Sequence, residues 1–99
     1  MSRVSIRFYS TLVPITGKRE IKWIFDGTKI NLVQLLKELC HRFGLTFCEQ
    51  IFDVSGEVWP STRIAVDGEF LPGRDPVAIL EKVVLSGQTV KIFPPTDGG

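Results

Sequence analysis

The stretch INLVQLLKELCHRFG, residues 30–44, changes the hydrophobic period of the chain. Its apolar side chains recur at i, i+3, i+4, i+7, i+8 and i+11, which is the spacing of one face of an α-helix. Charged and polar side chains fill the opposite face. The pattern therefore predicts an amphipathic helix with one apolar stripe. The stripe consists of Leu32, Leu35, Leu36, Leu39, Cys40 and Phe43.

Both ends of this helix have residues that can define them. Asn31 can cap the first free N–H groups through its side-chain oxygen, and Gln34 stands where a capping box has its second member. Ile30 can pack on Leu35 as a hydrophobic staple. Gly44 can adopt the left-handed conformation that ends a helix without strain on a Cβ atom. We therefore expect the helix to lie between Asn31 and Gly44.

Upstream of the helix, hydrophobicity alternates with a period of two, as in strands that have one face on a core. Two such runs lie at residues 4–8 and 21–25, and VPITGK between them is expected to be a loop because it contains proline and glycine. The sequence predicts an antiparallel hairpin. Its inward residues would be Val4, Ile6, Phe8, Ile21, Trp23 and Phe25.

Downstream of the helix the pattern is weaker. FCEQIFD can form a short helix that buries Phe47, Ile51 and also Phe52, and VSGEVWPS is expected to be a loop. RIAVDGEFL contains Asp67-Gly68, a pair suited to a tight hairpin turn. PVAILEKVVL is expected to make a short helical turn before the last strand.

The order of these elements predicts the fold. A helix must cover the apolar face of a sheet, and the last strand, residues 90–93, would return beside the first with Val90 and Ile92 inward. We predict an α+β protein with a β-grasp layout, a mixed sheet with one main helix packed on one face. The domain would span residues 1–93, followed by a flexible tail over residues 94–99.

The size and composition of the chain exclude several classes of function. A chain of 99 residues with 43% apolar side chains is the size of one domain. Its 12 Lys and Arg balance 11 Asp and Glu, and no basic run indicates nucleic-acid binding. No segment has the apolar length of a membrane span. We expect a cytoplasmic protein, monomeric on its own, with two free cysteines.

The residues IFPPTDGG at the end of the sequence predict chemistry. Two prolines must end a strand at Phe93, because proline fixes φ and lacks an N–H group. Two glycines can enter a narrow channel and leave the last carbonyl carbon open to a nucleophile. We therefore predict that Gly99 is the site of covalent attachment. The residues predicted to form the tail and bind partners are Phe93, Pro94, Pro95, Thr96, Asp97 and Gly98.

A carboxylate needs activation before transfer. A mixed anhydride with AMP supplies a leaving group, and a persulfide or an amine can then attack the carbonyl carbon. The chain has no glycine-rich phosphate loop, so an adenylating partner would use the ATP. We expect no catalytic residue, no metal site and no bound cofactor in the chain itself.

Other chemically interesting residues have simpler explanations. Cys40 and His41 are adjacent on the predicted helix, and with Cys48 they match no zinc-binding spacing. Cys40 falls on the apolar stripe and is expected in the core. Asp67 and Glu69 flank a turn and are assigned to turn formation rather than to acid–base catalysis.

The apolar and aromatic side chains are numerous for one small core. Either some of them form a contiguous docking patch on the uncovered face of the sheet, or residues 45–61 fold over them. The side chains concerned are Trp23, Ile24, Phe47, Phe52, Trp59, Phe70 and Phe93.

The segment KIFPPTDGG resembles the end of the molybdopterin synthase small subunits, in which a last strand runs into Phe-Pro-Pro-x-x-Gly-Gly. The opening hairpin, the helix NLVQLLKEL and the hairpin RIAVDGEFL also match that family. Small archaeal modifier proteins resemble the same pattern, and ubiquitin and the thiamine sulfur carrier do so more distantly. Ser86-Gly87-Gln88 and Asp97 depart from it, since the family has an acidic pair around that glycine and a small neutral residue before Gly-Gly.

This resemblance implies a sulfur carrier. An activating enzyme would adenylate Gly99, which would become a thiocarboxylate used with a molybdopterin synthase large subunit. The resemblance equally implies a ubiquitin-like modifier joined through Gly99 to lysines of target proteins, and one protein could do both. A third hypothesis, from another class, is a binding module with an inert tail.

Overall fold

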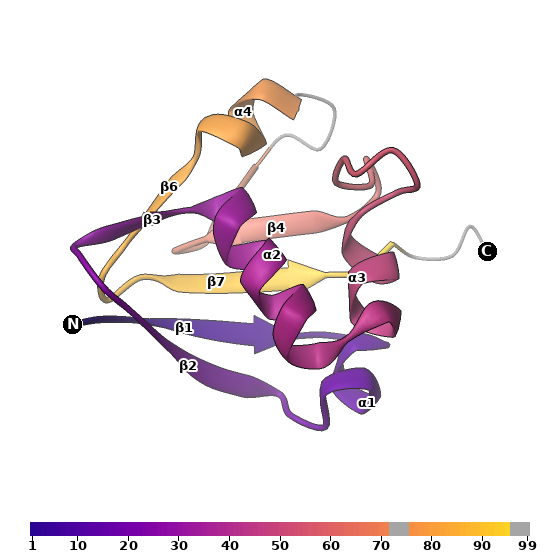
Figure 1. Ribbon diagram of the computed structural model, residues 1–99, viewed down its shortest axis with the longest axis horizontal. Coiled ribbons are helices and arrows are strands. Elements are labelled where there is room, and N and C mark those ends of the chain that lie inside the picture. The colour runs from indigo at the N-terminus through magenta and orange to yellow at the C-terminus, as the bar shows by residue number, and fades with distance from the viewer. Residues whose placement is uncertain (72–75, 96–99) are drawn as a thin grey trace.

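The fold is a sheet with helices packed across one of its faces (Figure 1). The computed structural model describes residues 1–71 and 76–95. No helix within these two ranges is long and apolar enough to cross a membrane. The elements, in chain order, are β1 (Ser2–Phe8), α1 (Leu12–Thr16), β2 (Glu20–Phe25), β3 (Lys29–Asn31), α2 (Leu32–Phe43), α3 (Leu45–Ile51), β4 (Arg63–Val66), β5 (Glu69–Phe70), α4 (Pro76–Glu81), β6 (Val83–Leu85) and β7 (Thr89–Phe93).

The main sheet has the strand order β2-β1-β7-β4-β5. β1 pairs antiparallel with β2, as the alternating hydrophobicity predicts. β7 returns parallel to β1, with Ile6 opposite Val90 and Phe8 opposite Ile92, and these four side chains are buried. The hairpin β4–β5 turns at Asp67-Gly68, and both residues have positive φ, as that turn requires. The predicted mixed sheet is therefore confirmed.

A second sheet was not predicted from the sequence. It consists of β3 and β6, which pair antiparallel over three residues each. The segment PVAILEKVVL therefore contains a helix, α4, followed by a strand, and is more than one helical turn. Strands of three residues are too short to show an alternating pattern, which is why the sequence missed them.

The two ends of α2 differ in how well the sequence predicts them. The Asn31 side-chain oxygen accepts from the backbone N–H of Val33 at 2.9 Å and of Gln34 at 3.2 Å, so the predicted cap is confirmed. The Gln34 side chain donates to Glu38 and forms no capping box. Gly44 has φ 93° and ψ −174°, which is not the predicted left-handed helical conformation. Its extended ψ lets α3 begin at the next residue.

Two predicted loops have more structure than expected. Most of VPITGK lies in α1, in which Pro14 falls within the first turn, where its missing N–H group costs no hydrogen bond. The predicted helix around Phe47 and Ile51 is confirmed as α3, and both side chains are fully buried. α3 packs against α1 and α2, and its Phe47 ring meets Phe8 of β1, so α3 extends the cover that α2 gives to the sheet.

The core lies between the sheet and α2 with α3. The ring of Phe8 meets those of Phe43 and Phe47 edge to face, with centroids 5.6 and 5.8 Å apart. Each such pair stabilises a core beyond the area it buries. The fully buried aliphatic side chains include Val4, Ile6, Leu32, Leu35, Leu36, Leu39, Ile51, Val90 and Ile92. The apolar stripe of α2 therefore faces the sheet, as predicted.

Candidate functional site

The end of the described chain leaves from the middle of the sheet. β7 lies between β1 and β4 and ends at Phe93, the residue before the two prolines (Figure 1). Pro94 is buried and Pro95 is half-buried. The remaining predicted tail residues, Thr96, Asp97, Gly98 and Gly99, lie outside the described part of the chain.

Three aromatic rings surround this point, and we call them the exit cluster: Tyr9, Phe70 and Phe93. The rings of Tyr9 and Phe93 stack with centroids 4.2 Å apart and planes 20° apart. The Phe70 ring lies 5.6 Å from Phe93, centroid to centroid. Phe70 is 54% exposed, and the other two are half-buried. The cluster supports the last strand residue from both sides and keeps one ring accessible to a partner.

Tyr9 was missed as a candidate residue by the sequence analysis. A signal was present, because Tyr9 follows the inward Phe8 and must therefore face the uncovered side of the sheet. The parallel pairing of β1 with β7, which places Phe8 beside Ile92, then brings Tyr9 to Phe93. Without that register, nothing in the sequence connects the two rings.

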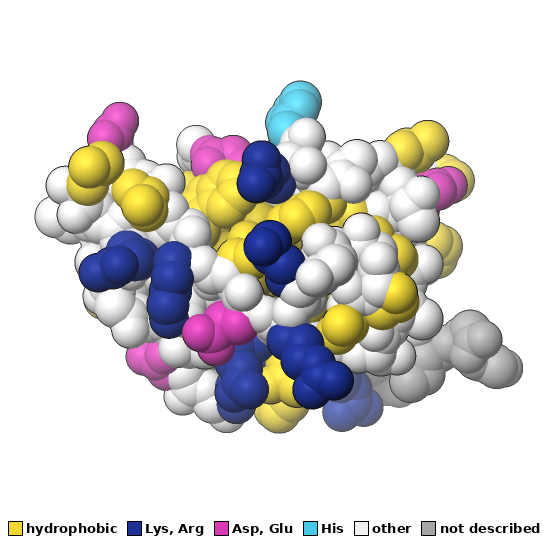
Figure 2. Space-filling model, turned by 90° about the horizontal axis from the view of Figure 1, so that it is seen from below, with side chains coloured by type: hydrophobic (Ala, Val, Ile, Leu, Met, Phe, Trp, Pro, Cys, Tyr) yellow, Lys and Arg dark blue, Asp and Glu magenta, His cyan; other side chains and the backbone are white. Residues whose placement is uncertain are grey.

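The uncovered face of the sheet is mainly basic beyond the exit cluster. Its basic side chains alternate along the strands with core residues, and Glu20 among them forms ion pairs with Arg7 at 3.4 Å and Lys22 at 3.2 Å. Figure 2, viewed from the β2 edge, shows Lys and Arg side chains gathered along this edge. We call the uncovered face of the sheet, apart from the exit cluster, the basic face. Its basic residues are Arg3, Arg7, Lys22, Arg63 and Lys91.

Of the two hypotheses for the aromatic side chains, neither holds as stated. Phe47 belongs to the core, and Phe52 and Trp59 lie on the helical side of the molecule near α3. Residues 45–61 thus do not cover the basic face. Ile24, 58% exposed, pairs with Arg3 on β2 at one edge of the sheet, whereas Phe70 lies on β5 at the opposite edge. Among the described residues of this sheet face, the exposed apolar side chains Ile24 and Phe70 are therefore separated by charged ones.

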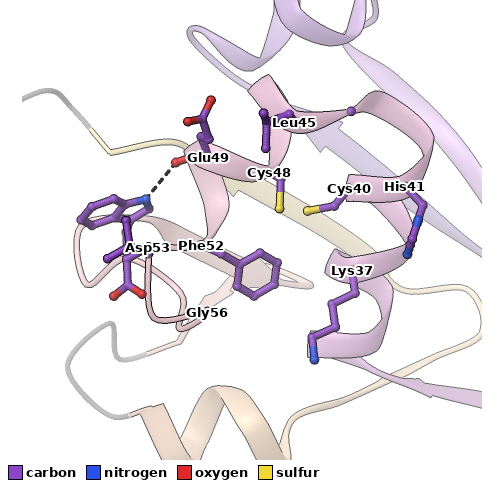
Figure 3. Close-up of a pocket in the computed structure, with 12 residues that line it drawn as sticks. Lys37, Cys40, His41, Leu45, Cys48, Glu49, Phe52, Asp53 and Gly56 are labelled. Carbon is purple, nitrogen blue, oxygen red and sulfur yellow. Dashed lines mark hydrogen bonds between the residues drawn. The ribbon is translucent and has the colours of Figure 1, made fainter.

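The other candidate residues behave largely as the sequence indicates. Asp67 accepts a hydrogen bond from the backbone N–H of Thr89 at 2.8 Å, which ties the β4–β5 turn to β7. Among the described residues, no three His, Cys, Asp or Glu side chains gather in a way that could hold a metal ion. Cys40 and Cys48 face each other between α2 and α3, whereas His41 points elsewhere (Figure 3). Cys40 is half-buried against the core rather than within it.

Similar solved structures come from small proteins of archaea and a trypanosome. Small archaeal modifier protein 1 of Methanosarcina acetivorans has a TM-score of 0.75 and 21% identity, covering 100% of this chain and 98% of that one. A protein of Pyrococcus furiosus described as a putative molybdopterin converting factor, subunit 1, has a TM-score of 0.71 and 20% identity. The comparison covers 97% of this chain and 100% of that one. Urm1 of Trypanosoma brucei has a TM-score of 0.73 and 17% identity, and the comparison covers 99% of this chain and 96% of that one.

This chain has the ubiquitin-like β-grasp fold. The likeness extends over nearly the whole length of both chains in each of these comparisons. No protein-family model matches the sequence, and no curated protein sequence matches it. At identities of 17 to 21% the comparisons establish the β-grasp architecture, and the function is argued from the site.

Proposed function

We propose that this β-grasp protein is a sulfur carrier whose Gly99 is adenylated by an activating enzyme and converted to a thiocarboxylate for molybdopterin synthesis. The observation that carries the proposal is the position of β7. A central strand, bonded on both sides and supported by the exit cluster, delivers the chain to Pro94 at a fixed point. The segment that follows has the sequence PTDGG, with no bulky side chain at its end.

In this proposal the partner protein binds the folded domain, and the tail carries the group that reacts. Five residues follow Pro94, and fully extended they reach about 17 Å at most. That length takes Gly99 into the site of another protein while the body stays outside. In the proposed reaction a Gly99 carboxylate oxygen attacks the α-phosphate of ATP, and pyrophosphate leaves. A persulfide sulfur of the activating enzyme then displaces AMP from the carbonyl carbon. A second thiol of that enzyme attacks the sulfur–sulfur bond, which releases the thiocarboxylate and leaves a disulfide on the enzyme.

The basic face and the exit cluster are the surfaces we propose for docking to the activating enzyme. They adjoin the origin of the tail, so a partner bound there holds the tail near its own nucleotide. Complementary charge increases the rate at which two proteins meet, and an acidic surface on the partner fits this requirement. The molybdopterin synthase large subunit would use the same origin, since it must also receive Gly99.

An alternative function is attachment through Gly99 to lysines of target proteins. It is supported by the similarity in structure to the small archaeal modifier proteins. The adenylate is the same in both schemes, and an amine replaces the persulfide as the nucleophile. The fold does not distinguish between the two acceptors, because both act after the tail has entered the activating enzyme.

The experiment that tests the proposal compares two tails on one body in the native cell. Removal of Gly98 and Gly99 is expected to abolish molybdopterin production and lysine conjugates, with unfolding free energy unchanged. Ser61→Ala changes an exposed residue outside the tail, keeps both glycines and serves as the control that should retain activity. Loss of molybdopterin alone supports the carrier, and loss of conjugates alone supports the modifier. If the shortened chain retained both, the tail would be inert and the third hypothesis, a binding module, would hold.

A further inference from the structure

Cys40 and Cys48 form a pair of thiols at the junction of α2 and α3. Cys40 lies in the last turn of α2, and Cys48 lies one turn into α3. Two successive backbone hydrogen bonds connect them through Gly44: its N–H donates to the Cys40 carbonyl at 2.8 Å, and the Cys48 N–H donates to the Gly44 carbonyl at 3.1 Å. The backbone therefore fixes the distance between the two side chains.

The two sulfur atoms point toward one another (Figure 3). Both cysteines are free and partly exposed. A structural cysteine that only fills the core would not need a second thiol as its neighbour. The arrangement is that of a dithiol, with both sulfur atoms within reach of solvent.

The dithiol lines a pocket of about 810 Å³ between α2, α3 and the turn that follows α3. This volume lies within the range of small-molecule sites. Phe52 and Trp59 form part of the wall, and the Trp59 indole N–H donates to the Glu49 carbonyl at 2.9 Å. Lys37 lines the pocket as well and can interact with an anionic group of a ligand. The carboxylates of Glu49 and Asp53 line it too, so a small disulfide that carries both ammonium and carboxylate groups has room and partners of both charges in this pocket.

We propose that Cys40 and Cys48 are a redox-active pair that undergoes thiol–disulfide exchange with low-molecular-weight disulfides. The Cys48 thiolate attacks one sulfur of the disulfide, forms a mixed disulfide and releases one thiolate. Cys40 then loses its proton to solvent and attacks the Cys48 sulfur, which releases the second thiolate. The two cysteines are oxidised by two electrons to an intramolecular disulfide, and the small disulfide is reduced to two thiols.

The electrostatics of the pair assign the order of attack. Burial, then the hydrogen bond and the charge of Cys48, raise the pKa of the Cys40 thiol to about 12. Cys40 therefore keeps its proton near neutral pH, and the attacking group is Cys48.

The test uses the full-length protein and oxidised glutathione as the probe, with intact mass and free-thiol content as readouts. The wild type is expected to lose both thiols together and to become lighter by two hydrogen atoms, with no lasting adduct. Cys40→Ser is expected to accumulate a single glutathione adduct, because Cys48 attacks and no second thiol releases it. Cys48→Ser is the matched variant and should react at least tenfold more slowly.

Other results would overturn the proposal. One is a wild-type protein that ends with one or two glutathione adducts and no internal disulfide. Another is an equal reaction rate for the two variants, which would contradict the assigned order. If a serine variant did not fold, the wild type alone, equilibrated in mixtures of reduced and oxidised glutathione, would decide whether the internal disulfide forms. None of these readouts depends on the tail or on the proposed carrier function.

Discussion

At the scale of single residues, the side chains whose roles could be predicted act within their own stretch of sequence. Asn31 caps α2 because its amide oxygen reaches N–H groups two and three residues ahead. The turn at Asp67-Gly68 is also local, because it depends only on the positive φ of these two residues. Tyr9 and Cys48 could not be assigned, because each depends on a residue brought close by the fold.

Asn31→Ala is expected to destabilise the protein by about 1 to 2 kcal/mol. Two donors of α2 lose their acceptor, and the Asn31 amide also donates to the Leu80 carbonyl at 2.8 Å, which holds α4. Urea unfolding followed by circular dichroism gives the value. Gln34→Ala is the control and should cost less than about 0.5 kcal/mol, since the side chain bonds only along the surface of the helix. Equal losses would contradict this assignment.

Asp53 gives a prediction for pH dependence. The hydrogen bond from Ser55, with others from the backbone N–H groups of Glu57 and Ser55, lowers the pKa of Asp53 below its usual value. Because the pKa of Asp53 is lower in the folded state than in the unfolded state, its ionised carboxylate stabilises the fold at neutral pH. This stabilisation is lost as the pH falls through the folded-state pKa. NMR titration of the Ser55 and Glu57 amide signals should show a midpoint below that of an unperturbed aspartate. A midpoint at or above the ordinary value would contradict the turn geometry.

At the scale of elements, long periodic segments could be predicted and short ones could not. The stripe of α2 and the alternation of β1 and β7 extend over enough residues to define a face. β3 and β6 have no such pattern and are identified only by their mutual pairing. The boundary between α2 and α3 was predicted at Gly44, but the conformation there depends on where α3 must go.

Gly44→Asn is expected to cost about 1 to 3 kcal/mol of stability. A Cβ atom at Gly44 would meet nothing within 4 Å, so the cost comes from its positive φ combined with extended ψ, which suits glycine alone. Gly17→Asn is the matched control: its φ of 76° and ψ of 9° are left-handed helical, which asparagine tolerates, and the loss should be below about 1 kcal/mol. Thermal or urea unfolding of both variants measures the difference. The reverse order would show that the α2–α3 junction is not strained.

At the scale of the whole molecule, the fold has two sides with different surfaces. The helical side carries the dithiol pocket, and the uncovered side of the sheet carries the basic face, with the exit cluster beside the end of β7. The basic face could not be predicted from the sequence, because its five basic residues come from four different strands. The overall charge of +1 also gives no indication of it. The tail pattern, in contrast, is contiguous and could be recognised directly.

Lys91→Glu is expected to slow adenylation of the tail about tenfold at low salt, because it reverses a charge on the proposed docking surface. ATP–pyrophosphate exchange with the activating enzyme of the same cell measures this rate. Lys29→Glu changes the charge equally but lies on β3, outside the basic face, and should leave the rate nearly unchanged. Added salt should reduce the difference between the two variants. Equal effects would rule out docking through the basic face.

The chemical state of Gly99 in the native cell tests the central claim most directly. Lys91 is the last basic residue, so trypsin leaves IFPPTDGG at the end of the chain or attached to a lysine. Mass spectrometry of that peptide is expected to find sulfur in place of one carboxylate oxygen, or, for the alternative function, an isopeptide bond. A Gly99 that carries only a free carboxylate in cells actively making molybdopterin and modifying proteins would contradict the account.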